Sequence, residues 1–322
     1  MKNININHFI FILILGLLSS CTKIETEPTR GYLCLTVTYE SINENGQEIF
    51  LSDIYKYELG SLQPTLIETI PYEKDYPVGV YLDYRNVIIY SGISERVSGN
   101  QVWLKNLDTN EKLLLTYDFY YLAYLQPISE DIILVGGVLK NAEDIAINLY
   151  ELDIDTQKLT KIDVNDDIDV RNVTYDSETK SVLFSGYSHT ELRKNIEEQD
   201  TVPFKMPNNY IFEYKKGVVT ELLEEDDEIL SVYRDKKQLQ YRTVNSGHLC
   251  FDLSKRINCA SSKSYLSNPY FDSKSNKVYY IDDQTMNVFD NKSDKETVVF
   301  KSNKSLSTIN NMFYIEREYD NE

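Results

Sequence analysis

The chain has 322 residues, and its 51 acidic against 33 basic side chains give a formal net charge of −18 at pH 7. This length suffices for one large domain or two medium ones. An acidic surface repels nucleic acid and anionic lipid headgroups, so we expect neither as a ligand.

The first thirty residues have the pattern of an export signal. Lys2 precedes an apolar block over residues 9–18, shorter than the roughly 20 residues that a membrane-spanning helix needs. The small residues that follow end in "LSSC", at Cys21. This segment resembles the lipobox of bacterial lipoproteins, which implies a signal peptide over residues 1–20 and a lipid on Cys21. An ordinary signal peptide with a chance cysteine is the alternative.

The lipobox resemblance also implies a location. A lipid on Cys21 would hold the protein on a membrane of the cell envelope through a polar tether over residues 21–31. Thr22, rather than Asp, follows the cysteine, which is typical of outer-membrane sorting if the host is Gram-negative. The domain would then face the periplasm or the exterior.

Residues 32–322 are predicted to form one all-β domain. Short runs of β-branched and aromatic residues recur between polar turns, in a phrase of strand, tight turn, strand, loop, strand, tight turn, strand. The phrase restarts near residues 78, 120, 170, 228 and 266, with a last partial start near 306. Four strands per unit at this spacing predict a β-propeller of six blades rather than a sandwich or barrel.

The two ends of the domain are expected to share one blade. After residue 306 there is apolar sequence for two strands, and two more precede residue 78, so together they would form a clasp that removes exposed sheet edges. A surplus strand, 32–40, would lengthen this blade or replace one of the C-terminal strands. The segment "YDSETKSVLFSG" (175–186) resembles repeats of TolB-type and WD-repeat propellers, without their Trp-Asp and Ser-Pro-Asp-Gly motifs. The resemblance is architectural and implies no function.

Cys250 and Cys259 are expected to form a disulfide. If Ser254 and Lys255 make a two-residue turn, the cysteines are a non-hydrogen-bonded pair, with Cα atoms about 4.5 Å apart and within disulfide range. A four-residue turn would reverse this parity. Cys34 is then expected to be a buried, unpaired residue.

The sequence offers no recognisable catalytic or metal site. Beyond the signal only His189 and His248 remain, and zinc, nucleophile-elbow and phosphate-loop motifs are absent. The stretch "DVNDDIDV" (163–170) fails as a calcium loop, because Ile168 stands where Gly is required and Thr174 where Glu is required. We therefore predict no catalytic residue, metal or cofactor. Recurring turn aspartates are expected to stabilise turns through their own hydrogen bonds: Asp108, Asp155, Asp176 and Asp272.

Charge is expected to differ between the two faces of the ring. In a propeller the loops between blades and those joining second to third strands share one face, here holding 165–169, 224–228 and the insertion 189–208. The candidate partner-binding residues on this face are Asp166, Asp167, Asp169, Glu224, Glu225, Asp226, Asp227, Glu228, and Leu192 and Ile196 of a short amphipathic helix. The tight turns of the other face mix Asp with Lys112, Lys158, Lys180, Lys236, Lys237, Lys255 and Arg256.

The favoured function is a membrane-anchored binding or scaffold lipoprotein that holds an envelope protein with a basic surface on its acidic face. An envelope hydrolase or lyase acting on a sugar or lactone is one alternative, and a ligand sensor is another. The acidic runs could also serve only to solvate their loops.

Overall fold

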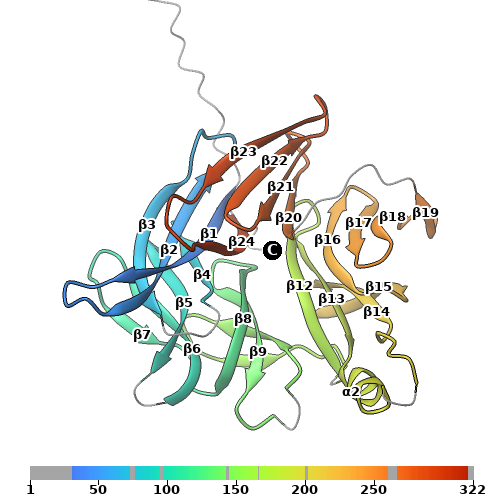
Figure 1. The fold of residues 1–322 in the computed structure, drawn as a ribbon, viewed down its shortest axis with the longest axis horizontal. Helices are drawn as coiled ribbons and strands as arrows, with labels where there is room; N and C mark the ends of the chain where they lie inside the picture. The colour runs from blue at the N-terminus through green and yellow to red at the C-terminus, as the bar shows by residue number, and fades with distance from the viewer. Residues whose placement is uncertain are drawn as a thin grey trace, which may run out of the picture.

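The computed structural model describes residues 31–72, 77–94, 97–142, 145–165, 167–199, 202–259 and 267–317, and these form six four-stranded antiparallel sheets around a ring (Figure 1). This is the predicted six-bladed β-propeller. Cys21 and the expected signal peptide and tether lie outside the described residues, apart from Gly31. No helix in the described ranges is long and apolar enough to cross a membrane.

Blades 1 to 3 follow the chain from the clasp onwards, and their strands are given from the innermost outwards. Blade 1 comprises β24 (Thr308–Glu316), β1 (Gly31–Ile42), β2 (Glu48–Glu58) and β3 (Thr65–Tyr72). Blade 2 comprises β4 (Gly79–Leu82), β5 (Val87–Ser94), β6 (Val97–Asn106) and β7 (Lys112–Leu114). Blade 3 comprises β8 (Phe119–Pro127), β9 (Ile132–Leu139), β10 (Asn148–Asp153) and β11 (Leu159–Lys161).

Blades 4 to 6 repeat this order, and blade 4 carries a helix in addition. Blade 4 comprises β12 (Ile168–Asp176), β13 (Ser181–Ser188), the helix α2 (His189–Glu197), β14 (Asn209–Lys215) and β15 (Val218–Glu225). Blade 5 comprises β16 (Ile229–Asp235), β17 (Gln238–Thr243), β18 (Gly247–Asp252) and β19 (Ile257–Cys259). Blade 6 comprises β20 (Ser267–Asp272), β21 (Lys277–Asp282), β22 (Thr285–Asp290) and β23 (Lys295–Lys301).

Blade 1 closes the ring with three N-terminal strands and one C-terminal strand. Of the two places left open for the surplus strand, the second is confirmed: the segment after residue 306 forms the single strand β24, and β1 replaces the other expected C-terminal strand. The register aligns Gly31 with Glu316. The first nine residues of β1 are all buried, because the strand lies between two neighbours in its own sheet and packs against adjoining blades.

Tyrosines fill much of the space between the inner strands. Tyr270 and Tyr314 stack with ring centroids 4.3 Å apart, and Tyr314 also stacks on Tyr175. Tyr279 contacts Tyr270 and Tyr57, so the rings form a buried series through blades 4, 6 and 1. These rings therefore serve the packing of the ring of blades rather than an open surface.

The propeller has two unlike faces. The loops between blades and the loops joining second to third strands emerge on one side, the loop face, and the tight turns emerge on the other, the tight-turn face. β1 begins and β24 ends where the other blades have a tight first turn. Both ends of the described domain, Gly31 and Arg317, therefore lie at the tight-turn face.

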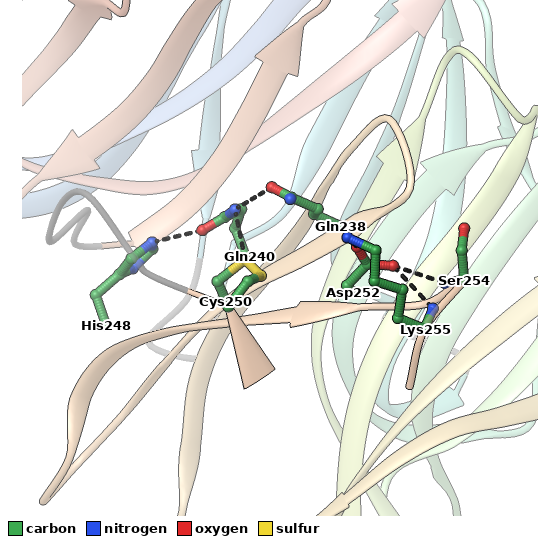
Figure 2. The surroundings of a disulfide bond; sticks show 8 residues. Gln238, Gln240, His248, Cys250, Asp252, Ser254 and Lys255 are labelled. Carbon is green, nitrogen blue, oxygen red and sulfur yellow. Dashed lines mark hydrogen bonds and ion pairs between the residues drawn. A yellow bond between two sulfur atoms is a disulfide. The ribbon is translucent and has the colours of Figure 1, made fainter. Parts of the chain in front are cut away.

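A disulfide joins Cys250 to Cys259 across the outer hairpin of blade 5, with the Cα atoms 5.0 Å apart (Figure 2). The turn between them spans four residues, 253–256, not the two assumed from the sequence, and Arg256 closes it by donating its N–H to the Asp252 carbonyl at 2.7 Å. The two cysteines nevertheless face each other in the register. Cys34 is free and buried in the described chain.

Candidate functional site: the loop face

The insertion between β13 and β14 is the largest feature of the loop face. Ser188 caps α2, because its side-chain oxygen accepts the backbone N–H of Glu191 at 3.0 Å. α2 buries none of its side chains, and it lies at the periphery of the ring beside blade 4 (Figure 1). Such a helix gains little from packing, so its ends must be held by other contacts.

Asp167, in the loop before blade 4, provides one of these contacts. Its carboxylate accepts hydrogen bonds from the Ser188 hydroxyl and, at 2.8 Å, from the backbone N–H of Thr190. Burial acts to raise the pKa of Asp167, but these hydrogen bonds outweigh it and hold that pKa below its ordinary value. The negative charge also lies at the positive end of the helix dipole. Asp167 thus fixes the start of α2.

The end of the insertion is tied down by asparagines. Asn195 donates from its side chain to the Lys205 carbonyl at 2.8 Å, which joins the helix to the returning chain. Asn208 donates to the Glu224 carboxylate at 2.6 Å. The insertion is therefore connected at both ends to the two acidic loops that the sequence placed on its face.

Several of the predicted partner-binding carboxylates are occupied inside the fold. Asp169 is buried, pairs with Arg171 at 2.6 Å and accepts the backbone N–H of Ile147 at 2.9 Å. Asp227 is also buried, and its oxygens accept the backbone N–H groups of Asn245 and Ser246 at 2.8 and 3.0 Å. These two residues position loops and offer no surface to a partner.

The remaining candidates differ in exposure. Glu225 is half-buried and accepts the Tyr241 hydroxyl at 2.9 Å, and Glu228 is half-buried as well. Glu224 and Asp226 are exposed. On α2, Leu192 is half-buried and Ile196 is exposed. Asp166 lies outside the described residues.

Large apolar side chains are exposed on this face, and sequence reasoning missed most of them. Those on blades 3 and 4 form what we call the apolar arc: Tyr117, Tyr120, Ile145, Ile196, Val202 and Phe204. Further exposed apolar residues lie at the same face on the other blades: Ile42, Ile93, Val244 and Leu306. The tight-turn face shows Leu62 as its counterpart among the described residues, and the others lie on outermost strands.

Hydrogen bonds link the segments that carry the apolar arc. Lys140 donates from its side chain to the Tyr117 carbonyl at 2.7 Å and from its backbone to the Asp118 carbonyl at 2.8 Å. At the other end of the same loop, Val170 donates to the Ile147 carbonyl at 2.9 Å. These bonds join the entry of blade 3 to the start of the loop after β9, and the end of that loop to β12 of blade 4.

Exposed carboxylates outnumber exposed basic residues on the loops and on the helix that carry the apolar arc. The carboxylates are Asp118, Asp163, Glu191, Glu197, Glu198, Glu224 and Asp226, and the basic residues are Lys161, Arg193, Lys194 and Lys205. Exposed apolar residues among an excess of carboxylates suit the binding of a basic partner. Tyr117 and Tyr120 could have been found in the sequence, because "TYDFYY" falls at a predicted boundary between blades.

The described residues contain no group of three or more His, Cys, Asp or Glu that could hold a metal ion. His248 lies in blade 5, where its Nε2 is 3.2 Å from the Gln240 side-chain oxygen (Figure 2). His189 opens α2, and its backbone N–H donates to the Asp167 carbonyl at 2.8 Å. The two histidines thus sit in separate structural settings.

No family model and no curated protein matches the sequence. The fold is similar to a chain in the crystal structure of a nidogen/laminin complex, with a TM-score of 0.55 and 12% identity over 90% of this chain and 100% of that chain. It is also similar to TolB from Acinetobacter baumannii, with a TM-score of 0.54 and 13% identity over 94% and 71% of the two chains. An oligogalacturonate lyase in complex with manganese has a TM-score of 0.49 and 12% identity over 84% and 74%. The predicted resemblance to TolB-type propellers is confirmed at the level of the fold.

Proposed function

We propose that this chain is a lipid-anchored protein of the cell envelope whose loop face binds a protein partner, without catalysis. The exposed apolar side chains of the arc, on segments where exposed carboxylates outnumber basic residues, are the observation that carries the proposal, because exposed apolar surface with polar surroundings marks protein-interaction sites. The partner has apolar side chains that cover the arc and lysine or arginine around them, which complements the carboxylates.

The anchor part of the proposal is supported by the lipobox-like sequence and by the position of Gly31. The chain enters the propeller at the tight-turn face. A tether that starts at Cys21 would therefore hold that face toward the membrane and present the loop face away from it. In a Gram-negative host the anchor is in the outer membrane, and the partner is an envelope protein.

The arc can be tested with a matched pair of valines. Val202 in the arc and Val298 on the outermost strand β23 are both 55% exposed. A photoreactive residue at position 202, in intact cells of the producing host, is expected to capture one specific protein that position 298 does not capture. With that protein purified, Phe204→Ser and Asp226→Lys should each weaken binding by tenfold or more, about the value of one hot-spot contact.

The control is Val298→Ser, which should leave both binding and thermal stability unchanged. The proposal is wrong if the captured protein binds the arc variants as tightly as it binds the natural chain. Equal capture from positions 202 and 298 would also contradict it.

A further inference from the structure

A pocket of about 700 Å³ opens on the tight-turn face, away from the apolar arc. It is lined by the first turns of blades 4 and 6, by Leu59 and Gly60 of blade 1, and by Tyr270 and Tyr314 of the inner strands. Lys180 also lines a second pocket of about 250 Å³ toward blade 3. The larger volume lies within the usual range for small-ligand sites.

The tight-turn face has one basic half and one acidic half. The turns and adjoining strand ends of blades 4 to 6 carry Lys180, Lys215, Lys216, Lys236, Lys237, Lys255, Arg256, Lys274, Lys277, Lys292 and Lys295, with Asp176, Glu178, Asp235, Asp252, Asp272, Asp290 and Asp294. Those of blades 2 and 3 carry Asp83, Asp108, Glu111, Glu130, Asp131, Asp153 and Asp155, with Arg85, Lys112 and Lys158. The pocket lies on the basic half.

Three aspartates on the basic half are turned to their own backbone. Asp272 accepts the Lys274 N–H at 3.2 Å, and Asp290 accepts the Lys292 N–H at 2.8 Å. Asp252 accepts the N–H groups of its turn in the same way. Their charges are therefore partly balanced by peptide dipoles. At the pocket itself Lys180, Lys274 and Lys277 outnumber the carboxylates of Glu178 and Asp272, which leaves an excess of positive charge.

The polar groups of the pocket suit a small anion. Lys274 is exposed and Lys277 is half-buried at its rim, and Ser273 also lines it. The hydroxyl of Ser275 donates to Asp272, and that of Ser177 is hydrogen-bonded to the Tyr270 hydroxyl. Tyr270 and Tyr314 are each only 4% exposed, because they stack on one another. They leave little ring surface on which a sugar could stack, so charge and hydroxyl groups decide what binds.

We propose that this pocket binds a phosphate group, with Lys274 and Lys277 as its charged contacts. Lysine binds phosphate as a compact point charge, and the Ser273 hydroxyl donates to one of the remaining oxygens. From the sequence, anionic headgroups were excluded as ligands because the whole chain is acidic. The charge is unevenly distributed, so this exclusion does not apply to the basic half of the tight-turn face. The phosphate comes either from a soluble molecule or from headgroups of the membrane beneath this face. The membrane source rests on the proposed lipid anchor.

The test is calorimetric titration of the detergent-solubilised full chain with inorganic phosphate and with glycerol 1-phosphate at low ionic strength. We expect saturable binding that Lys274→Gln/Lys277→Gln weakens by about thirtyfold, the combined effect of two lysines near an anionic group. Lys112→Gln/Lys158→Gln, with the same charge change on the acidic half of the same face, should bind as the natural chain does. Absence of saturable binding, or equal loss in both double variants, overturns the proposal.

A second measurement separates the two sources. The lipidated protein is placed in vesicles of phosphatidylcholine with or without phosphatidylglycerol, and acylation of Lys274 by a water-soluble reagent is compared with that of Lys158 by mass spectrometry. Slower acylation of Lys274 alone in phosphatidylglycerol vesicles assigns the phosphate to headgroups. Unchanged acylation, together with binding of glycerol 1-phosphate, assigns it to a soluble molecule. If the protein carries no lipid anchor, the calorimetric titration still tests whether the pocket binds phosphate.

Discussion

The carboxylate of Asp227 is 7% exposed and accepts backbone N–H groups of the loop after β17. In the sequence it is one of five consecutive acidic residues, 224–228, that look alike. The composition indicates a charged loop. It does not show which carboxylate turns inward, because that depends on contacts with the loop after β17. The sequence could therefore place this acidic stretch on the correct face without separating Asp227 from the exposed Glu224 and Asp226.

Turn aspartates show the same limit. Asp176 and Asp272 accept N–H groups of their own turns, so these two predictions are confirmed. For Asp108 and Asp155 the prediction was wrong, because Asn106 and Asp153, at the strand ends, accept the turn N–H groups instead. Such a side chain bonds backbone two or three residues ahead, so an error of two residues in the strand end selects the wrong residue.

His248 should make stability depend on pH between about 6.5 and 4. Burial, with Arg242 nearby, lowers the pKa of His248 to about 4 in the folded protein. The unfolded chain takes up this proton near pH 6.5, so stability is lost as the pH falls through this window. We expect urea denaturation to show the natural chain losing about 1–2 kcal/mol more than His248→Gln between pH 7 and pH 4, a value reduced because the ring is partly exposed. Parallel curves for the two proteins would contradict this.

At the scale of single elements, the outermost strands are the weakest. β7, β11 and β19 have three residues each, and none of these residues is fully buried. Short, exposed outer strands discourage pairing with other chains, at the cost of local stability. Burial contributes little to the stability of β19, and the disulfide holds this strand covalently to β18.

Removing the disulfide should loosen β19 selectively. In Cys250→Ser/Cys259→Ser the closed loop of about ten residues is lost, and we expect the free energy of unfolding to fall by about 2–3 kcal/mol. Hydrogen exchange should accelerate at the amides of β18 and β19 and stay unchanged in blade 2. Two additional free thiols in the unreduced, denatured natural protein would show that the bond is absent and would contradict the prediction.

At the scale of the whole molecule, the repeat made the architecture predictable. Predicted first strands near 78, 120, 170, 228 and 266 begin at 79, 119, 168, 229 and 267. The composition of the clasp was not predictable, because apolar sequence after residue 306 fits one long strand as well as two short ones. The apolar arc was missed for a related reason: exposure of Val202 or Phe204 depends on how the insertion lies, which strand periodicity does not describe.

The clasp should decide whether the ring exists at all. β24 contributes five buried apolar side chains, and β1, against which it pairs, is buried almost throughout. Burying one such side chain contributes roughly 1.5–3 kcal/mol, so losing five approaches or exceeds the 5–15 kcal/mol by which domains are usually stable. We expect a chain truncated after residue 305 to lose its cooperative thermal transition and to aggregate through the exposed edge of β1.

A circular permutant distinguishes loss of the strand from interruption of the chain. Gly31 and Glu316 are register partners, so their Cα atoms lie about 5 Å apart and a short Gly-Ser linker joins them. New ends fit between Lys216 and Gly217, at an exposed tight turn with open space around the glycine. This permutant keeps every strand and should melt cooperatively within a few degrees of the natural chain. If it fails to fold, or if the truncated chain folds with an unchanged melting temperature, closure by β24 is not what holds the ring together.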